Sequence, residues 1–474
     1  MPGNDRWALS RRCLYLTDMK NYYLGIDLGT SAIKLLAVSP DGERLSVRRA
    51  YDTPTPEGWL TALKSALAEL PSERIAAIAL SSQVGTYLTD TGAVLNWNCS
   101  AGSEELAHLK ATLSDEAWLE AIGMVHPELV SYPLPRLLYI ASHFPEAKAV
   151  EMPKELLIRA LTGNTVTDIF SWRGLCHPEK KAYADTLLTR FGISLKLPPV
   201  ALPTDLAGTV TPEAANHYGL PQGIPVYVGC NDFFAGLLGM GIYDIGTAFA
   251  LYGTSAHVGM ITQAPQSGRI VSGPYFHGCA TYGGTKASGA SCDFAMQNFG
   301  IDGLTPETAF ENPPIFLPYL AGERAPIYDE NAKGVFFGIT DKTSQQHMAY
   351  AVLEGVVFSL YHIYTSLNAQ SPTRLITGGG SAVNPMMAKL KASLFDCEVF
   401  RVKENDASAL GAALLAMTGS GIYASIEQAA QAAADYELAA IPDERLGNRL
   451  QARFSVYQSL YGDLKHTFEK FREL

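Results

Sequence analysis

The chain has 474 residues, which is too long for one compact core, so we expect two domains of roughly 200 residues each. Hydrophobic residues make up 47% and charged residues 18%, a balance typical of a well-buried soluble α/β protein and unlike that of a disordered chain. The formal net charge of -11 disfavours nucleic acid as a partner, because phosphate backbones select for basic faces.

The seven cysteines are odd in number and include no CxxC pair, so we interpret them as reduced thiols of a cytoplasmic protein. No apolar run approaches the length of a membrane span, which predicts no membrane partner. Residues 1–18 lack the apolar stretch of a signal peptide, and Met19 lies just before the first predicted strand. We therefore expect residues 1–18 to be a disordered or non-native extension.

The chain is predicted to open with a strand, Tyr22–Asp27, a Gly-Thr-Ser turn and a second strand, Ile33–Val38. This is a β-hairpin or meander, not a strand that leads into a helix. Further predicted elements of the first half are a helix at Trp59–Leu70, a buried strand at Ile75–Leu80, a mostly helical stretch at 103–190, a buried strand at Ile224–Gly229 and a helix at Phe234–Gly241.

The second half alternates strands and helices in the same way. Its predicted elements are a strand at Thr247–Tyr252, a helix at Met348–Leu367, a strand at Arg374–Thr377, a loop at Gly378–Gly380, and helices at Pro385–Phe395, Ala407–Met417 and Arg449–Phe471. We expect the domain boundary near Gly241–Gly246, which gives domains at 19–243 and 244–474.

One four-residue segment occurs twice. Gly29-Thr30-Ser31-Ala32 recurs as Gly253-Thr254-Ser255-Ala256, and each copy lies between two β-rich runs. One copy near the start of each half indicates duplicated domains.

Three segments are candidates for chemistry. In the first, Gly29 allows a tight turn, and Thr30 and Ser31 offer hydroxyls to phosphate oxygens. Lys34 adds a positive charge for a phosphate, and Asp27 can hold Mg²⁺. A plain β-turn with a solvated lysine is the equally open alternative. In the second, Asp232 follows a buried strand and can take a proton from an attacking hydroxyl. Judged on sequence alone, a helix N-cap is the commoner role for such an Asp.

The third candidate segment is Gly378-Gly379-Gly380-Ser381, between a predicted strand and a predicted helix. Three glycines let the backbone lie close to a nucleotide, and the helix N-terminus behind them favours a negative group. A flexible connection is the alternative, and we favour the ligand interpretation.

The order and spacing of these segments resemble the FGGY carbohydrate kinases, which include xylulokinase, gluconokinase and glycerol kinase. The resemblance covers nearly the whole chain from Tyr22 to about Met417, and five groups of motifs carry it. They are Tyr23–Ser31, Gly322–Pro326, Gly334–Glu354, Ile376–Ser381 with Asn384-Pro385, and Ser408–Ala413.

The resemblance implies an α/β fold of two RNase H-like domains, as in actin, hexokinase and the Hsp70 ATPase, with a catalytic cleft between them. It implies ATP-dependent phosphorylation of a hydroxyl on a small sugar, sugar acid or polyol, with Asp232 as general base and Mg²⁺ held by Asp27. The residues implied to bind nucleotide or phosphate are Gly29, Thr30, Ser31, Lys34, Gly253, Thr254, Ser255, Gly289, Gly378, Gly379, Gly380, Ser381 and Asn384.

The residues implied to face the acceptor, which is the molecule that receives the phosphoryl group, depart from the family pattern. The implied acceptor-binding residues are Gln83, Val84, Gly85, Thr86, Trp97, Asn98, Asp232 and Phe233. Many relatives carry Gln-Met-His-Gly at the first four, and Trp-Asn-Asp-x-Arg where this chain has Trp97–Ala101. They often have an amide residue at the position of Phe233. In a separate family signature near Ser131–His143, Arg136 replaces the usual Lys and Tyr139 the usual Trp. Such changes fit ordinary divergence between subfamilies. They also fit a less hydroxylated acceptor enclosed by Phe233 and Tyr87, and this second interpretation predicts little turnover of xylulose or glycerol.

A second function class is an inactive ATP- or sugar-binding sensor on the same fold. Asp27, Thr30, Asp232 and Thr254 are all present, and this favours catalysis. A homodimer is expected only as a habit of the family.

Overall fold

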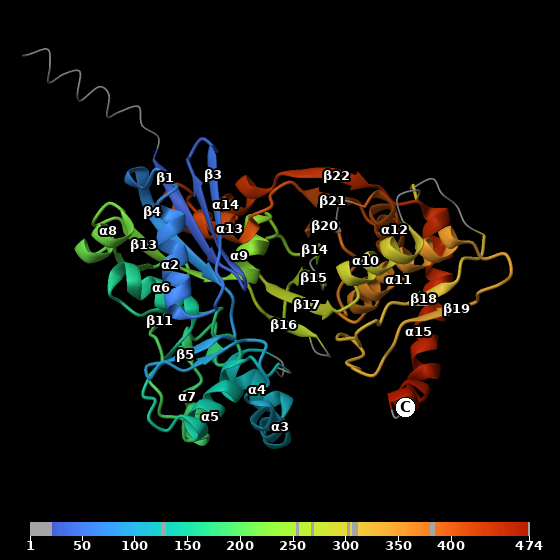
Figure 1. The fold of residues 1–474 in the computed structure, drawn as a ribbon, viewed down its shortest axis with the longest axis horizontal. Helices are drawn as coiled ribbons and strands as arrows, with labels where there is room; N and C mark the ends of the chain where they lie inside the picture. The colour runs from blue at the N-terminus through green and yellow to red at the C-terminus, as the bar shows by residue number, and fades with distance from the viewer. Residues whose placement is uncertain are drawn as a thin grey trace, which may run out of the picture. The chain divides into compact units, whose positions relative to one another are not determined.

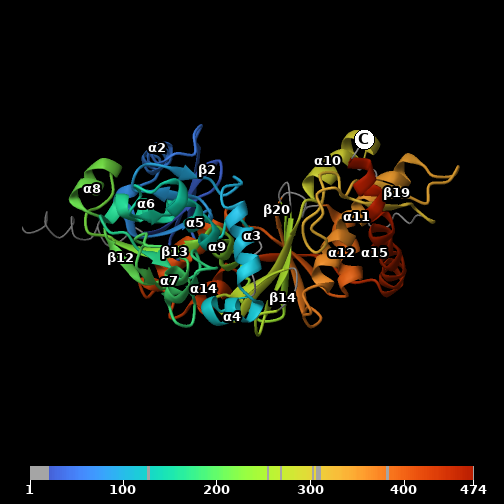
Figure 2. The same cartoon turned by 90° about the horizontal axis from the view of Figure 1, so that it is seen from below.

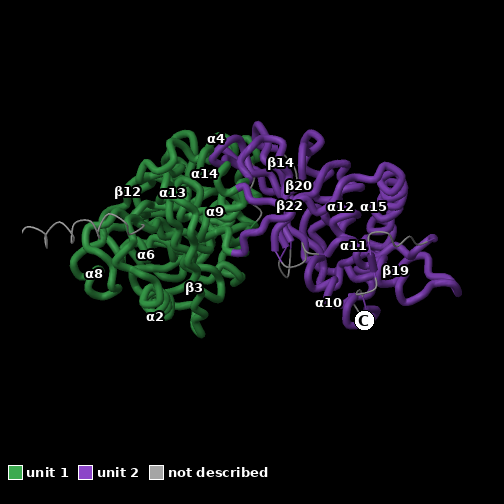
Figure 3. Tube along the Cα trace, turned by 90° about the horizontal axis from the view of Figure 1, so that it is seen from above, with its two compact units in different colours: residues 1–122, 128–241, 406–433 green, residues 123–127, 242–405, 434–474 purple. Residues whose placement is uncertain are grey.

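The computed structural model of the chain describes residues 21–124, 129–252, 256–266, 270–300, 304–305, 311–379 and 384–472. Residues 1–18 therefore lie outside the described part, and so does the prediction about them. The chain forms two compact units (Figure 3): residues 1–122, 128–241 and 406–433 make the first, and residues 123–127, 242–405 and 434–474 the second. The domain boundary expected between residues 243 and 244 stays a prediction.

The first unit is built on a six-stranded mixed sheet. In spatial order its strands are β12 (Leu206–Thr209), β13 (Pro225–Asn231), β4 (Ile75–Ser82), β1 (Tyr22–Leu28), β2 (Ala32–Val38) and β3 (Arg44–Ala50). Strands β1, β2 and β3 form an antiparallel meander, whereas β1, β4 and β13 are parallel neighbours. The predicted opening meander is therefore confirmed.

Helices cover both faces of this sheet (Figures 1 and 2). One face carries α2 (Pro56–Leu67), α6 (Pro153–Thr162) and α8 (Pro212–Tyr218), and the other α9 (Asp232–Gly239), α13 (Ala407–Gly419) and α14 (Ile426–Ala433). Apolar residues on alternate positions of β1, such as Leu24 and Ile26, are fully buried against α2 and α6. The alternation follows from the two-residue period of a strand.

The chain between β4 and β12 forms a smaller part of the first unit. It contains β5 (Tyr87–Thr89), β6 (Val94–Leu95), α3 (Ser103–Thr112), α4 (Asp115–Ile122), α5 (Pro133–His143), β7 (Val150–Glu151), α6, β8 (Thr167–Asp168), β9 (Cys176–His177), β10 (Ala182–Tyr183), α7 (Asp185–Arg190) and β11 (Val200–Ala201). The prediction of a mostly helical stretch over 103–190 is wrong for 163–184, where turns and two-residue strands replace helix. There, Gly163 ends α6 in the left-handed conformation.

The second unit is built on a seven-stranded sheet with the same central arrangement. In spatial order its strands are β16 (Val271–Pro274), β17 (Cys279–Thr285), β15 (Ala256–Thr262), β14 (Thr247–Tyr252), β20 (Arg374–Gly379), β21 (Val399–Val402) and β22 (Tyr436–Ala440). Strands β14, β15 and β17 are antiparallel in turn, and β14, β20 and β21 are parallel. The pair β14–β15 therefore corresponds to β1–β2, as the repeated Gly-Thr-Ser-Ala segment predicts.

Long helices pack on one face of the second sheet around one large apolar core and one smaller apolar cluster. They are α10 (Gly289–Phe299), α11 (Gln345–Thr365), α12 (Pro385–Phe395) and α15 (Glu444–Arg472), beside the hairpin of β18 (Ile315–Leu317) and β19 (Val335–Phe337). Within the described residues of the whole chain, no helix is both long and apolar enough to cross a membrane, and no disulfide joins the cysteines.

Candidate active site

Three parallel strands of the first unit end at one edge of the sheet with polar residues. Asp27 of β1 and Cys230 of β13 both lie opposite Ser81 of β4. Gln83 follows β4 directly, and Asp232 follows β13 directly. The carboxyl edge of parallel strands is where open α/β sheets gather reactive groups.

Asp27 is a buried carboxylate, with 4% of its surface exposed. The hydroxyl of Ser81 donates to its Oδ1 at 2.8 Å. Burial raises the pKa of Asp27 above the ordinary value and the nearby Asp406 adds to this, while Ser81 and the positive charge of Lys34 act in the opposite direction. One carboxylate that keeps room for water and phosphate oxygens is the kind of ligand Mg²⁺ takes.

Asp232 is the first residue of α9, and it does not cap that helix. The cap is Asn231, whose Oδ1 accepts the backbone N–H of Phe234 at 2.8 Å. Asp232 Oδ1 accepts the adjacent N–H of Phe233 at 2.8 Å. Burial, and then the negative charge of Asp27, raise the pKa of Asp232 to about 7, against the lowering effects of the Phe233 N–H and Arg173.

The turn between β1 and β2 carries the predicted phosphate-binding hydroxyls. Gly29 donates its N–H to the Ala32 carbonyl at 3.0 Å, and the Tyr51 hydroxyl donates to the Gly29 carbonyl. Thr30 and Ser31 are exposed at the tip. Lys34 lies on β2 with its Nζ 3.6 Å from Asp406 Oδ1, so the structure pairs its charge with a carboxylate.

The segment after β4 carries four predicted acceptor residues, of which only Val84 is partly exposed. Gln83 donates its N–H to the Leu28 carbonyl at 2.9 Å, while its side-chain Oε1 is buried and has no hydrogen-bond partner among the described residues. The Trp97 N–H donates to Thr86 Oγ1 at 3.1 Å, so the strand-end segment is tied to the loop that holds the exposed Trp97 and Asn98. Gly85 lies against Ser131.

Two residues that depart from the family pattern, Arg136 and Cys99, contact each other. Arg136 is fully buried, and its Nη1 donates to Cys99 Sγ at 2.7 Å. Its Nη2 donates to the carbonyls of Asn96, Trp97 and Cys99 at 3.0–3.3 Å. The Arg at 136 and the Cys at 99, each a departure from the family pattern, therefore meet in one contact that fixes the 96–99 loop.

The sequence suggested that Tyr87 encloses the acceptor, but the structure does not place Tyr87 at an exposed site. Its side chain is fully buried, its hydroxyl donates to the Ser131 carbonyl at 3.2 Å, and its ring meets Trp172 edge to face. Tyr87 therefore supports the 131–132 segment from within. Phe233 is half-buried and lies beside Phe234.

Sequence reasoning missed three residues at this edge: Arg173, Tyr132 and Asn231. The Arg173 guanidinium carbon lies 5.4 Å from the centre of the Phe234 ring and 5.8 Å from that of Tyr132. The only local signal was an arginine beside an aromatic residue, in Trp172-Arg173-Gly174, which is too common to single out. The Tyr132 hydroxyl and the Asn231 Nδ2 are buried without a hydrogen-bond partner in the described part of the chain.

In the second unit the predicted triglycine loop is partly wrong. Gly378 and Gly379 belong to β20, opposite Leu251 and Tyr252 of β14. Gly379 has φ +94°, and a Cβ there would lie 1.9 Å from the Tyr252 carbonyl oxygen, so close strand packing requires this glycine. Gly380, Ser381 and residues 253–255 lie outside the described residues.

The other predicted nucleotide residues lie at helix starts. Gly289 is the first residue of α10, and Asn384 caps α12, accepting the Met387 N–H at 3.0 Å. Within the described residues, no three His, Cys, Asp or Glu side chains form a metal-binding group.

Comparison with known proteins matches both halves of the chain. The family model described as "FGGY family of carbohydrate kinases, N-terminal domain" matches residues 22–239, and its C-terminal counterpart matches residues 248–420. Among curated proteins, the xylulose kinase of Lactococcus lactis subsp. lactis is 29% identical, over 95% of this chain and 99% of its own length.

Solved structures show the same fold. The gluconate kinase of Lactobacillus acidophilus aligns with a TM-score of 0.85 at 24% identity, over 96% of this chain and 100% of its own. The ligand-bound xylulose kinase of the same species has the same TM-score and identity, over 95% and 100%. The predicted fold class, α/β with two RNase H-like domains, is confirmed.

Proposed function

Because the chain belongs to the FGGY family of carbohydrate kinases, we propose that it transfers the γ-phosphoryl group of ATP to a hydroxyl of a small sugar, sugar acid or polyol. The observation that carries the proposal is the edge formed by β1, β4 and β13. There, Asp27, Gln83 and Asp232 follow one another across three parallel strands.

In the proposed reaction Asp232 is the general base. Its carboxylate accepts the proton of the acceptor hydroxyl as that oxygen forms a bond to the γ-phosphorus. The bond between the γ-phosphorus and the oxygen bridging to the β-phosphate breaks, and ADP leaves. The raised pKa of Asp232 suits this role, because a base that titrates near the working pH accepts a proton readily and releases it again.

The acceptor would be bound by the first unit, by Asp232 and seven further residues. These are Gln83, Val84, Gly85, Thr86, Trp97, Asn98 and Phe233. The buried Gln83 Oε1, which has no partner in the described structure, supports this assignment, because a substrate hydroxyl would satisfy it.

The phosphates and adenosine would be bound by two sets of residues. The phosphate set is Gly29, Thr30, Ser31, Lys34, Gly253, Thr254 and Ser255, and the adenosine set is Gly289, Gly378, Gly379, Gly380, Ser381 and Asn384. Asp27 would hold Mg²⁺, which when bound neutralises phosphate charge. A catalytic cleft between the domains, a homodimer and a cytoplasmic location stay expectations drawn from the resemblance.

The test is ADP release from the full chain with ATP, Mg²⁺ and a panel of ketopentoses, polyols and sugar acids. Wild type should release ADP with at least one acceptor, and Asp232→Asn should lower kcat by roughly 10²–10⁴-fold because the proton acceptor is lost. Nucleotide affinity, measured by calorimetry, should stay unchanged. Transfer that survives Asp232→Asn would refute the base, and tight ATP binding without any transfer would favour a sensor.

A further inference from the structure

A bulge interrupts β13 shortly before the proposed base. The pairing of β13 with β4 shifts register between Tyr227 and Cys230, so the two residues between them, Val228 and Gly229, lie opposite a single residue of β4. An extra residue changes which side chains point to each face of a strand. The bulge therefore decides in which direction the end of β13 leads into Asp232.

Backbone groups at the bulge are bound by the segment that precedes β12. The N–H of Gly229 donates to the Pro203 carbonyl at 2.8 Å, and the N–H of Val228 donates to the Asp205 carbonyl at 3.1 Å. Gly229 has φ +70°, and a Cβ there would lie 1.7 Å from the Leu80 carbonyl oxygen. Glycine is the residue that fits both this conformation and this close approach, so the sequence is adapted to the bulge.

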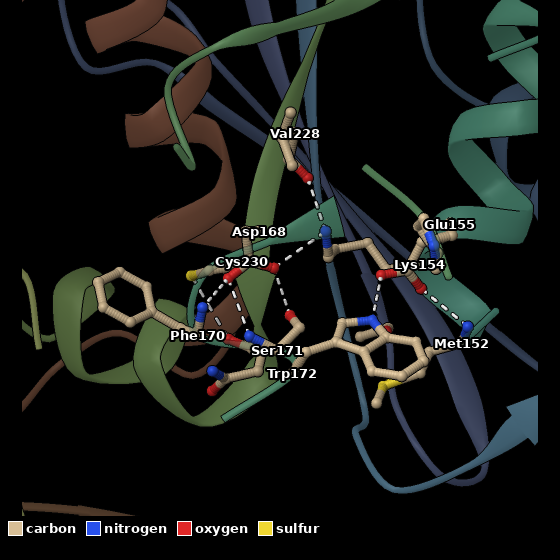
Figure 4. A network of polar contacts seen from close by, with 12 residues as sticks. Met152, Lys154, Glu155, Asp168, Phe170, Ser171, Trp172, Val228 and Cys230 are labelled. Carbon is tan, nitrogen blue, oxygen red and sulfur yellow. Dashed lines mark hydrogen bonds and ion pairs between the residues drawn. The ribbon is translucent and has the colours of Figure 1, made fainter. Parts of the chain in front are cut away.

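The carbonyl group at the bulge is bound by a buried charged side chain. Lys154 of α6 donates from Nζ to the Val228 carbonyl at 3.3 Å, and the same Nζ lies 3.0 Å from Asp168 Oδ2. Figure 4 shows the ammonium between the carboxylate and the carbonyl. The side chains of Lys154 and Asp168 are 1% and 0% exposed, and an ammonium can be buried this fully only with such acceptors around it.

Asp168, the last residue of β8, is itself held by the turn that follows it. Its Oδ1 accepts the N–H groups of Phe170 and Ser171 at 2.8 and 2.9 Å, and the Ser171 hydroxyl donates to its Oδ2. These three hydrogen bonds fix the carboxylate, and the fixed carboxylate fixes the ammonium of Lys154 (Figure 4). The bulge in β13 is therefore anchored to a rigid point outside its own sheet.

Loss of the bulge would move the base. In an uninterrupted strand Gly229 would lie opposite Ser81, where Cys230 lies now, and every later residue would shift by one position. One position along a strand is about 3.3 Å. Because a reacting group displaced by about 1 Å can already cost about 10²-fold in rate, Asp232 would no longer serve as an efficient base.

We propose that the ion pair of Lys154 and Asp168 positions the catalytic base, by holding the Val228 carbonyl and with it the bulge that directs Asp232. This inference rests on the proposed function and adds two positioning residues to it. A purely stabilising role is the alternative, because breaking a buried ion pair destabilises a fold wherever the pair lies. The two roles differ in one respect: a positioning residue acts only through Asp232.

In the test, the full chain carries Lys154→Met together with Asp168→Asn. This double variant loses one positive and one negative charge, so no unpaired charge is left buried, and an amide oxygen at residue 168 can still accept the N–H groups of Phe170 and Ser171. For an acceptor that wild type phosphorylates, kcat should fall by roughly 10- to 100-fold because the base is misplaced. Affinity for ATP, measured by calorimetry, should change by less than about threefold.

The same double change in the Asp232→Asn background separates positioning from general damage. There it should lower the residual kcat by less than about threefold, because a residue that acts through the base loses its effect once the carboxylate is gone. A fall by the same factor in both backgrounds would overturn the inference. Asp168→Asn alone is a milder variant that weakens the hold on Lys154; it should lower kcat by roughly 3- to 10-fold and show the same dependence on Asp232.

Glu155→Gln is the matched control, since Glu155 is a buried carboxylate of the same helix and network (Figure 4). Its oxygens accept the Met152 N–H at 3.0 Å and Trp172 Nε1 at 3.3 Å, and neither donor belongs to β13. It should lower the urea midpoint and leave kcat within about threefold of wild type.

Hydrogen exchange followed by mass spectrometry should show faster exchange at residues 228–232 in the double variant and not in Glu155→Gln. Unchanged kcat or unchanged exchange at these residues in the folded double variant would overturn the inference while the kinase assignment stands. Absence of transfer by wild type, or transfer that survives Asp232→Asn, would overturn the proposed function and the inference together.

Discussion

At the scale of single residues, the ionisation of Asp232 determines the pH behaviour we expect. Burial disfavours the charged form of both Asp232 and Asp27, and the negative charge of Asp27 adds to the effect on Asp232. Like charges in a poorly hydrated place disfavour ionisation, so the proton is held to higher pH than on an ordinary aspartate. Arg173 opposes this effect, because its positive charge lowers the pKa of Asp232.

The predicted pH profile follows from this. A base acts only when it is deprotonated, so kcat/KM should rise with pH and level off above the pKa of about 7 that burial and Asp27 give Asp232. Arg173→Gln removes a charge that lowers this pKa, so the midpoint should move to higher pH. Initial rates measured between about pH 5.5 and pH 9 check both statements. A flat profile in wild type, or a midpoint that moves down in the variant, would contradict them.

At the scale of elements, the contact between α9 and α13 is set by glycine. The helix that carries Asp232 at its first residue lies so close to α13 that a Cβ on Gly411 would fall 1.8 Å from the Ala235 carbonyl oxygen. Backbone can approach backbone at this distance only where no side chain intervenes. The position of Asp232 thus depends on a residue 179 places further along the chain (411 minus 232).

Substitution of Gly411 by alanine should destabilise the protein because of where Gly411 packs, and not because of helix propensity. Gly411→Ala should lower the free energy of unfolding by about 1–3 kcal/mol through overpacking. Gly462→Ala is the matched control, because Gly462 is a helical glycine of α15 with open space around its Cβ position, and it should gain about 0.5–1 kcal/mol. Urea unfolding measures both, and equal effects of the two changes would refute the packing explanation.

At the scale of the whole molecule, two copies of one sheet arrangement carry different groups. The first unit has acidic and amide side chains at the ends of β1, β4 and β13, whereas the second has glycines at the end of β20 and helix starts that follow β17 and β20. A carboxylate suits proton transfer, and glycine backbone suits close approach of a nucleotide. The duplicated fold thus offers two chemically distinct surfaces.

Hydrogen exchange followed by mass spectrometry should separate these two roles. ADP alone is expected to slow exchange at the starts of α10 and α12, in the second unit. The acceptor alone should slow exchange at residues 83–86, 97–98 and 231–234 of the first unit. Protection by ADP confined to the acceptor segments would contradict the proposed division.

Much of the fold was predictable from local sequence. The opening meander, the strands that end at Asp27 and before Asp232, and the helix Pro385–Phe395 were predicted within about two residues, because periodicity and turn chemistry act over short distances. The carbohydrate-kinase class was also predictable and is confirmed by the match of both domains. The glycines at 378 and 379 were misassigned to a loop, because their pairing partner lies in β14, far away in sequence.

The sequence by itself determined the family, the repeated strand–turn–strand unit and the candidate base, since each is encoded in contiguous residues. Only the tertiary structure decided that Asn231 caps α9 in place of Asp232, that Arg136 meets Cys99, and that Arg173 lies over the ring of Phe234. It also places residues 406–433 in the first unit. The physical reason is that these contacts join residues brought together by the packing of sheets and helices, which no local pattern encodes.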